Sequence, residues 1–248
     1  MHLLRVLICA CLLPWGAMAG PFDDLSDADR AALHGEIRDY LLQNPDIVVE
    51  VIEMLEARER EQTARADTLL VQQNRDALSR PDGSFVAGNP QGDITVVEFI
   101  DYQCSYCKRA HPEVADLLAG DGNIRLIQKE LPILGPLSEQ AARAATAVLL
   151  GQPAEVYADF SDRLMRHQGP LSAALINRYA SQAGADVAAM RAAADGDAVT
   201  AHLNSNRALA RALRVTGTPT FVIGDQLVRG YLQAEQMEAL IAAQRAEM

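Results

Sequence analysis

Two cysteines three positions apart carry the chemistry that this sequence most clearly encodes. Cys104 and Cys107 enclose Ser-Tyr, and the only other cysteines, Cys9 and Cys11, lie close to the N-terminus. Three uses fit such a pair: a structural disulfide, half of a metal site, or a dithiol that exchanges with other disulfides. A disulfide stabilises a fold more when it closes a longer loop, and this loop is very short. The redox-active dithiol is therefore the interpretation we favour.

Thiol–disulfide exchange requires a thiolate, whereas a free cysteine titrates near ~8.5. Cys104 directly follows an apolar run, and helical spacing then continues through Val114 and Leu117. This pattern places the pair at a helix N-terminus, where unpaired N–H groups and the helix dipole stabilise an anion. We expect Cys104 to be acidic, exposed and attacking. Cys107, one turn into the helix, is expected to be shielded and to resolve the mixed disulfide.

Strands and helices alternate from about residue 81 onward. Apolar runs predict five strands, at 85–87, 94–100, 124–127, 221–223 and 226–228. Alanine-rich helical sequence fills about 138–213, and an amphipathic helix covers 234–245. The order is a β-α-β unit, a helical insertion and a β-β-α unit, which predicts an α/β domain over residues 81–248. Glu98 interrupts the second strand, and a buried carboxylate there must be paired or neutralised, which raises its pKa.

Residues 20–80 form a separate helical region. Two helices are predicted by apolar residues at helical spacing: Leu33, Ile37, Tyr40 and Leu41, then Val48, Val51, Ile52 and Leu55. Two helices of this size cannot close a core of their own. They must pack on the main domain or on copies of themselves. We favour self-association through residues 24–56, because the polar stretch 57–67 separates the apolar faces from the main domain.

The first 19 residues have the pattern of a cleaved signal peptide. Arg5 precedes an apolar run over residues 6–13, and Ala17-Met18-Ala19 offers a cleavage site. The run is too short to span a bilayer, which takes about 20 residues. The mature chain is thus predicted to begin near Gly20 and to work in an oxidising compartment, the periplasm.

The charge of the chain excludes some partners. Its formal net charge is −11, which makes nucleic acid and anionic lipid poor ligands. There is no Gly-rich phosphate loop, and we expect no cofactor and no resident metal.

The order of elements resembles the thioredoxin superfamily. The Cys-x-x-Cys pair lies at the first strand-to-helix junction, and Thr218-Pro219 opens a late strand. The long helical insertion resembles the DsbA-like branch of that superfamily. The resemblance covers roughly residues 84–246. It implies a thioredoxin fold with a large helical insertion, preceded by an N-terminal oligomerisation arm.

Four residues match positions with roles in that superfamily. Pro112 lies where the family kinks its active-site helix, and Pro219 matches the cis-proline loop that faces the cysteines. Glu98 matches the buried acid beneath the disulfide, and Lys129 the lysine that accompanies this acid. The resemblance implies that Glu98 accepts a proton from Cys107. The other interpretation is a salt-bridged carboxylate at an exposed strand edge.

The residues around the pair imply a direction for the reaction. Before a cis proline, the backbone of Thr218 is free to pair with an extended substrate. Threonine at this position is commoner in the disulfide isomerases of the family, and Tyr106 favours the same assignment. We expect Ser105, Tyr106, Thr218 and Pro219 to contact substrate in an isomerase or reductase. A dithiol oxidase that introduces disulfides is the alternative.

The region before the domain resembles the suppressor-of-copper-sensitivity protein C (ScsC) group. The resemblance rests on residues 21–80, on the Gly-Asn-Pro-x-Gly-Asp lead-in and on Lys-Glu-Leu-Pro-Ile-Leu-Gly. It implies a dimer or trimer that acts on misfolded or reduced exported proteins and is reset by a membrane redox partner. A second class of function is copper binding, because thiolates suit Cu(I) and His111 follows the pair by one helical turn.

Overall fold

The structure, a computed structural model, describes residues 24–247. The expected signal peptide, with Cys9 and Cys11, lies outside the described residues. Two compact units divide the chain between Glu59 and Arg60, and each is described by itself. No helix within residues 24–247 combines the length and apolar character that crossing a membrane requires.

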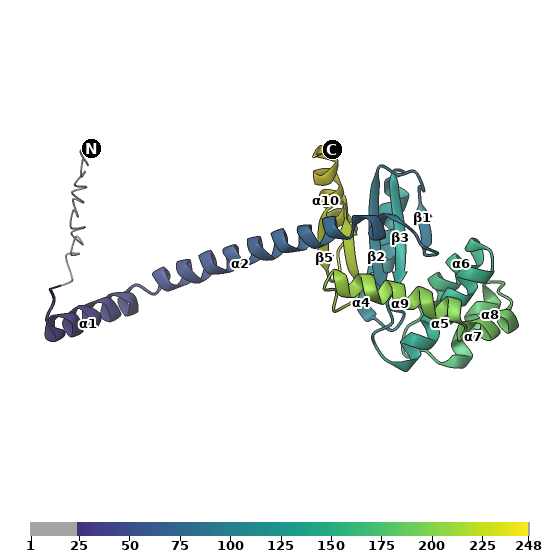
Figure 1. Cartoon of the computed structure of the whole chain (residues 1–248), viewed down its shortest axis with the longest axis horizontal. Coiled ribbons are helices and arrows are strands. Elements are labelled where there is room, and N and C mark those ends of the chain that lie inside the picture. Colours follow the sequence, from purple (N-terminus) through teal and green to yellow (C-terminus); the bar gives the residue numbers. More distant parts are fainter. Residues whose placement is uncertain (1–23, 248) are drawn as a thin grey trace, which may run out of the picture. The chain divides into compact units, whose positions relative to one another are not determined.

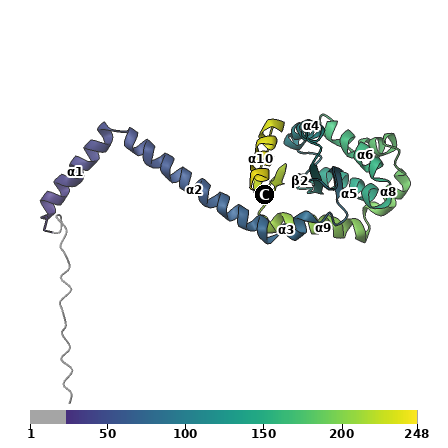
Figure 2. The ribbon, with the colours of Figure 1, turned by 90° about the horizontal axis from the view of Figure 1, so that it is seen from above.

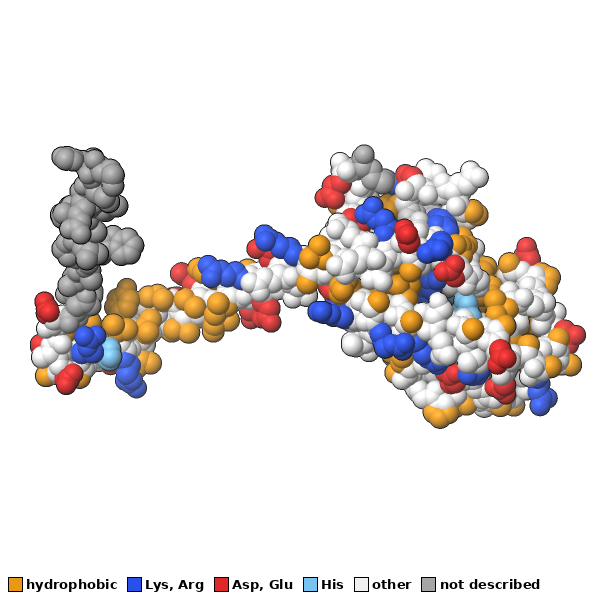
Figure 3. Space-filling model, viewed as in Figure 1, with side chains coloured by type: hydrophobic (Ala, Val, Ile, Leu, Met, Phe, Trp, Pro, Cys, Tyr) orange, Lys and Arg blue, Asp and Glu red, His pale blue; other side chains and the backbone are white. Residues whose placement is uncertain are grey.

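The first unit consists of helix α1 (Asp27–Gln43) and the beginning of helix α2 (Asp46–Gln73). Ser26 caps α1 by accepting a hydrogen bond from the N–H of Asp29. No side chain of residues 24–59 is buried, so the predicted apolar face is exposed. Figure 3 shows these hydrophobic side chains gathered on α1 and the start of α2. Its large members are Ile37, Tyr40, Leu41, Leu42, Val48, Val49, Val51, Ile52, Met54 and Leu55.

The second unit is built on a five-stranded sheet in the order β1-β3-β2-β4-β5 (Figure 1). The strands are β1 (Phe85–Gly88), β2 (Ile94–Ile100), β3 (Ile124–Glu130), β4 (Thr220–Ile223) and β5 (Gln226–Arg229). Only β2 and β3 pair in parallel, and helix α4 (Ser105–Gly120) connects them. The remaining neighbours pair antiparallel. The predicted strands and the predicted thioredoxin fold are thus present.

Both faces of the sheet are covered. On one face, α4 and helix α10 (Ala234–Ala246) pack against Val96 and Leu126. On the other, helix α9 (Asp197–Ala212) packs against Val97 and Ile127. Figure 2 shows α4 and α10 on one side of β2, and α9 on the opposite side. Side chains of β2 and β3 point alternately to these two faces, and this decides which face each polar residue of the two strands occupies.

Helices fill the predicted insertion between β3 and β4. They are α5 (Pro136–Gly151), α6 (Ala154–Arg166), α7 (Ala173–Gln182), α8 (Val187–Ala194) and α9. Alanines of α5 make close helix packing possible, and the resulting core includes Tyr102, Cys104 and Cys107. The insertion therefore forms one wall of the dithiol region.

Residues 60–80 belong to the second unit, although sequence analysis groups them with the arm. Val71 of α2 and Leu78 of helix α3 (Arg75–Ser79) are buried against the far face of the sheet. Asp67 forms a double hydrogen-bonded ion pair with Arg229 of β5. This packing could not be predicted from the polar sequence, because single buried residues on an otherwise charged helix produce little apolar periodicity.

Candidate active site

Cys104 and Cys107 lie where β2 gives way to α4. Cys104 is the N-cap of α4, and its Sγ accepts a hydrogen bond from the N–H of Cys107 at 3.4 Å. Cys107 lies in the first turn of the helix, and both side chains are free thiols. The predicted position at a helix N-terminus is therefore present, with a backbone donor directed at the first sulfur.

Burial of the two sulfurs differs less than the sequence implies. Cys104 is 6 % exposed and Cys107 is 1 % exposed. The expected exposed Cys104 is thus wrong for this reduced state, because the loop before β4 covers it. When it is protonated, the Cys104 thiol donates to the carbonyl oxygen of Thr218, which lies 3.0 Å from Sγ. A substrate that reaches Cys104 therefore also meets the backbone of Thr218.

The two thiols differ strongly in acidity. A hydrogen bond from the Cys107 thiol is the main cause that lowers the pKa of Cys104 to about 6. The Thr218 side chain and the backbone N–H groups of Cys107 and Tyr106 lower it further, while burial opposes these effects. Burial, above all, raises the pKa of Cys107 far above its ordinary value. At neutral pH, Cys104 is the thiolate and Cys107 keeps its proton.

The Thr218-Pro219 peptide bond is cis and directly precedes β4. Pro219 is buried, and Thr218 is half-buried against the Cys104 sulfur. Ser105 and Tyr106 follow Cys104 in the first turn of α4, and both are exposed. These four predicted substrate contacts thus come from two segments that meet at the Cys104 sulfur.

Glu98 is buried inside the domain, which excludes the alternative of an exposed edge carboxylate. Its Oε2 accepts a hydrogen bond from Nε2 of Gln128 at 3.1 Å. Burial raises the pKa of Glu98 to about 7, and the Gln128 amide opposes this shift. The Glu98 charge in turn contributes to the raised pKa of Cys107. The carboxyl and the second thiol are therefore electrostatically coupled neighbours.

Lys129 does not accompany Glu98. In the parallel register Glu98 is opposite Gln128, and Phe99 is opposite Lys129. Successive side chains of a strand point to opposite faces, so Lys129 lies on the far side of the sheet. Its Nζ donates to the carbonyl oxygen of Pro81 at 3.3 Å. Sequence analysis missed Gln128. Strand alternation could have found it, because Gln128 and not Lys129 is on the same face of the sheet as Glu98.

A second buried carboxyl also escaped sequence analysis. Oε1 of Glu130 accepts hydrogen bonds from the hydroxyls of Tyr102 at 2.6 Å and Tyr157 at 2.9 Å. Oε2 of Glu130 is buried without a partner. Burial raises the pKa of Glu130 to about 8. The signal was available in the sequence, since this acid ends an apolar strand as Glu98 interrupts one.

His111, the additional ligand that a copper site would need, is engaged elsewhere. Its Nε2 lies 2.8 Å from Oδ1 of Asp162 on α6. Among residues 24–247, no three His, Cys, Asp or Glu side chains are grouped as a metal site.

Known families match both parts of the chain. The family model described as "Thioredoxin" matches residues 80–243. The model described as "Copper resistance protein ScsC N-terminal domain" matches residues 29–62. The first match covers more than half of the chain and includes the dithiol.

Curated relatives also match about two thirds of this chain. "Na(+)/H(+) antiporter NhaA 1" of Salinispora arenicola is 30% identical over 174 residues, which is 66% of this chain and 25% of that protein. The chain thus spans about a quarter of the length of the curated relatives that it matches.

Solved structures are similar over one or both parts. A thioredoxin-like oxidoreductase from Silicibacter pomeroyi is 40% identical, covers 70% of this chain and 98% of its own, and has a TM-score of 0.66. A linker-deletion mutant of Proteus mirabilis ScsC is 27% identical, covers 91% of this chain and 99% of its own, and has a TM-score of 0.67. With the dithiol at the head of α4 and an ScsC-type helical region before the domain, the chain belongs to the thioredoxin family of thiol–disulfide oxidoreductases, in its ScsC- and DsbA-like part.

Proposed function

We propose that this chain exchanges disulfides in exported proteins, as an isomerase or reductase in the periplasm. The observation that carries the proposal is the unequal acidity of the two thiols. Cys104 is a thiolate at neutral pH and Cys107 is not, which assigns attack to the first sulfur and resolution to the second. The proposal includes removal of residues 1–19 as a signal peptide and export of the remaining chain to the periplasm.

The reaction follows from these assignments. The Cys104 thiolate attacks one sulfur of a substrate disulfide, and the other substrate sulfur leaves as a thiolate that takes up a proton. The product is a mixed disulfide. In reduction, Cys107 loses its proton and attacks the Cys104 sulfur, which releases the substrate reduced and leaves a Cys104–Cys107 disulfide. In isomerisation, another substrate thiolate attacks the mixed disulfide and releases Cys104 instead.

Glu98 is the base that accepts the proton of Cys107 in this proposal. A thiol whose pKa is raised by burial attacks only if a base takes its proton. Glu98 is buried, its charge acts on the Cys107 thiol, and its pKa of about 7 is close to the working pH. Gln128 orients the carboxyl through its hydrogen bond. Lys129 lies on the other face of the sheet from Glu98, and we assign it no part in the proton transfer.

Replacing Glu98 with glutamine is expected to slow resolution of the mixed disulfide by about a hundredfold. In the wild type, resolution should rise with pH through about 7, because the carboxylate must be ionised. The variant should lack this step. The measurement is rapid quenching of a mixed disulfide between pH 5 and 9, followed by mass spectrometry. An unchanged pH profile would remove Glu98 from the mechanism.

Stability gives an independent check on Glu98. Its folded pKa is raised from 4.5 to about 7, so the folded state binds the proton more tightly than the unfolded state. Glu98 should therefore contribute a loss of about 3 kcal/mol of stability as pH rises from 4.5 to above 7, in addition to the loss from Glu130. Glu98→Gln should lose about 3 kcal/mol less than the wild type over this range, because glutamine carries no charge and Glu130 titrates in both proteins. Denaturant titrations at the two pH values measure the difference.

The isomerase assignment over the oxidase rests on the exposed apolar face of residues 24–59. An isomerase has to hold a misfolded substrate while its disulfides are attacked, and several sites in one oligomer raise the effective concentration for that step. The match to the ScsC N-terminal domain supports a homo-oligomer through this face. The expected partners are misfolded exported proteins and a membrane protein that resets the dithiol.

A pair of assays separates the two directions. The protein is expected to reactivate a scrambled-disulfide ribonuclease in a glutathione buffer faster than it oxidises the reduced ribonuclease. Cys107→Ser is the matched variant, because isomerisation needs only Cys104 while oxidation needs the complete disulfide. Rapid oxidation with no reactivation of the scrambled protein would assign an oxidase instead.

Copper binding is the second candidate, and the name of the matching N-terminal family supports it. The two thiols are the soft ligands that the site offers, and His111 is paired with Asp162.

A further inference from the structure

Glu130 is a buried acid that takes no part in the proton transfer proposed for Glu98. It is two residues after Gln128 in β3, so its side chain lies on the same face of the sheet as Gln128 and Glu98. Its Oε1 accepts hydrogen bonds from the hydroxyls of Tyr102 and Tyr157, whereas Oε2 has no donor. A carboxyl oxygen buried without a donor is costly when it is charged, which favours a protonated Glu130.

Three parts of the second unit meet at this carboxyl. Tyr102 belongs to residues 101–104, the turn that carries Cys104 and that we call the dithiol turn, and Tyr157 belongs to α6 of the helical insertion. The Tyr102 hydroxyl also lies 3.0 Å from Oγ of Ser161, a second residue of α6. The acid thus connects the dithiol turn and the end of β3 to the helical insertion.

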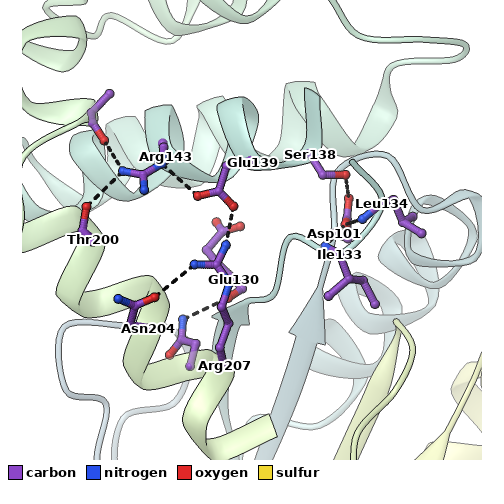
Figure 4. Close-up of polar contacts among 12 residues, drawn as sticks. Asp101, Glu130, Ile133, Leu134, Ser138, Glu139, Arg143, Thr200, Asn204 and Arg207 are labelled. Atoms are coloured by element: carbon purple, nitrogen blue, oxygen red, sulfur yellow. Dashed lines mark hydrogen bonds and ion pairs between the residues drawn. The ribbon is translucent and has the colours of Figure 1, made fainter. Parts of the chain in front are cut away.

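Asp101 fixes the start of the dithiol turn independently of Glu130. Four donors satisfy its carboxylate: the N–H of Gln103, the hydroxyl of Ser138 and the N–H groups of Ile133 and Leu134. Figure 4 shows this carboxylate with its partners in α5 and in the loop before α5, and it also shows Glu130. Changes at Tyr102 or Glu130 leave the Asp101 anchor in place, so they test the second anchor alone.

The surroundings of Glu130 favour its neutral form. Burial raises the pKa of Glu130 to about 8, the two tyrosine hydroxyls lower it, and the charges of Asp101 and Glu98 raise it. Both tyrosines keep their protons, because burial raises their pKa values well above the ordinary value. At neutral pH, Glu130 is therefore an uncharged acid that accepts from two hydroxyls. It adds no charge to a region that already contains other acids and a thiolate.

We propose that Glu130 is a positioning residue that fixes the dithiol turn through the Tyr102 hydroxyl and thereby holds the Cys104 sulfur in front of the N–H groups of α4. This inference rests on the proposed function, because it concerns the same cysteine. Tyr102 lies two residues before Cys104, whose N–H donates to the backbone oxygen of Asp101 at 3.0 Å. The N–H of Cys107 in turn donates to the Cys104 Sγ.

Displacement of the dithiol turn should make Cys104 less acidic. The hydrogen bonds that Sγ accepts lower the pKa of Cys104, and a hydrogen bond weakens steeply when donor and acceptor are misaligned. Without the anchor at Tyr102, the sulfur is held less firmly against its donors. The pKa of Cys104 should then rise toward its ordinary value.

The test is the titration of the Cys104 thiolate by its ultraviolet absorbance, in the reduced full chain. The corresponding Cys104→Ser protein is the blank, so that other groups do not contribute. In the wild type, about half of Cys104 should be ionised at pH 6. Tyr102→Phe keeps the ring and removes the hydroxyl, and it should raise the pKa by about one unit, the effect of one hydrogen bond to a charged group. The ionised fraction at pH 6 should then fall about fivefold.

Tyr157→Phe is the matched control. It removes the other hydroxyl that donates to Oε1 of Glu130, but this hydroxyl belongs to α6 and not to the dithiol turn. The hydrogen bond from Tyr102 remains, so Cys104 should titrate as in the wild type. An equal rise of the Cys104 pKa in both variants would mean that any loss from the buried cluster has this effect, and the specific role of Tyr102 would be wrong.

Two variants of Glu130 separate the acceptor from the charge. Glu130→Gln keeps an uncharged side chain with an acceptor oxygen, so the low pKa of Cys104 should be retained. Glu130→Leu removes the acceptor and should raise this pKa about as much as Tyr102→Phe does. The two changes should not add in the double variant, because they break the same hydrogen bond. If Glu130→Leu leaves the titration unchanged while Tyr102→Phe shifts it, Ser161 holds the hydroxyl and Glu130 is not the positioning residue.

The neutral state of Glu130 has a test of its own. Its folded pKa is raised from 4.5 to about 8, so the stability that it contributes below pH 4.5 is lost as pH rises through about 8. Glu130→Gln should therefore lose less stability than the wild type between pH 7 and pH 9.5, measured by denaturant titration. Equal losses would mean that Glu130 is already ionised at neutral pH, and its role as a neutral acid would be overturned.

Reaction with oxidised glutathione at pH 7 separates the failure of this inference from that of the proposed function. If the wild type reacts and Cys104 of Tyr102→Phe titrates as in the wild type, the positioning role is overturned and thiol exchange stands. If the wild type does not react, the proposed function itself is overturned.

Discussion

Replacing Cys104 with serine is expected to abolish thiol–disulfide exchange, with a loss of more than about a thousandfold against any disulfide substrate. The reason is chemical, because a serine hydroxyl cannot form or release a disulfide. Cys107→Ser should behave differently: the Cys104 thiolate still attacks, and the mixed disulfide then accumulates because no second thiol resolves it. The pKa of Cys104, about 6, means that attack should already be near its maximum at pH 7.

Mass spectrometry after alkylation is the appropriate measurement for both variants. The only tryptophan of the chain is Trp15, within the expected signal peptide, so the mature protein offers no tryptophan fluorescence. The pair of variants forms its own control, since each removes one sulfur at neighbouring positions. Accumulation of mixed disulfide on Cys107 in the Cys104→Ser variant would reverse the roles assigned here. Retained activity in that variant would indicate a holdase, in which the cysteines take no part.

Charges on the apolar face of the arm are expected to separate oligomerisation from thiol chemistry. Leu41 and Ile52 are exposed members of this face, and an interface that buries them cannot accept two carboxylates without a large desolvation cost. The double variant Leu41→Glu/Ile52→Glu should therefore be monomeric by light scattering. It should lose most reactivation of scrambled ribonuclease, by at least about tenfold, and keep its rate with glutathione.

Gln62→Glu is the control for the charge itself. It adds a carboxylate to the same helix, α2, at an exposed position of the second unit. It should leave both the oligomer and the isomerase activity intact. An oligomer that survives the double variant would place the interface on another surface. A monomer with full isomerase activity would instead remove the arm from the catalytic function.

The structure decides where a shortened protein without the arm should begin. A chain that begins at Pro81 would remove Val71 and Leu78, which are buried in the core of the second unit. It would also remove Asp67, the ion-pair partner of Arg229. Such a protein would confuse loss of the arm with loss of stability, because burying two aliphatic side chains contributes about 3–6 kcal/mol. A chain that begins at Arg60 keeps these contacts.

Much of this molecule follows from local patterns in the sequence. The strand at Ile94–Ile100, the dithiol after it and the helix after the dithiol are each encoded within a short window, by side-chain periodicity and residue type. The exposed apolar face of the arm is equally local. An acidic Cys104 could be predicted from its place at a helix N-terminus, although the hydrogen bond from the Cys107 thiol is the main cause of the lowered pKa. Resemblance to a known family then supplied the late cis proline.

The tertiary structure decided what depends on register and on contacts between distant segments. A shift of one residue moves a strand side chain to the other face, so the sequence left open that Gln128, and not Lys129, is opposite Glu98. The cover that Thr218 forms over Cys104 joins residues 114 positions apart. The hydrogen bonds that the Asp101 carboxylate accepts from the N–H groups of Ile133 and Leu134 join residues more than 30 positions apart. Periodicity records which side chains are buried, but only the folded chain determines which of them meet.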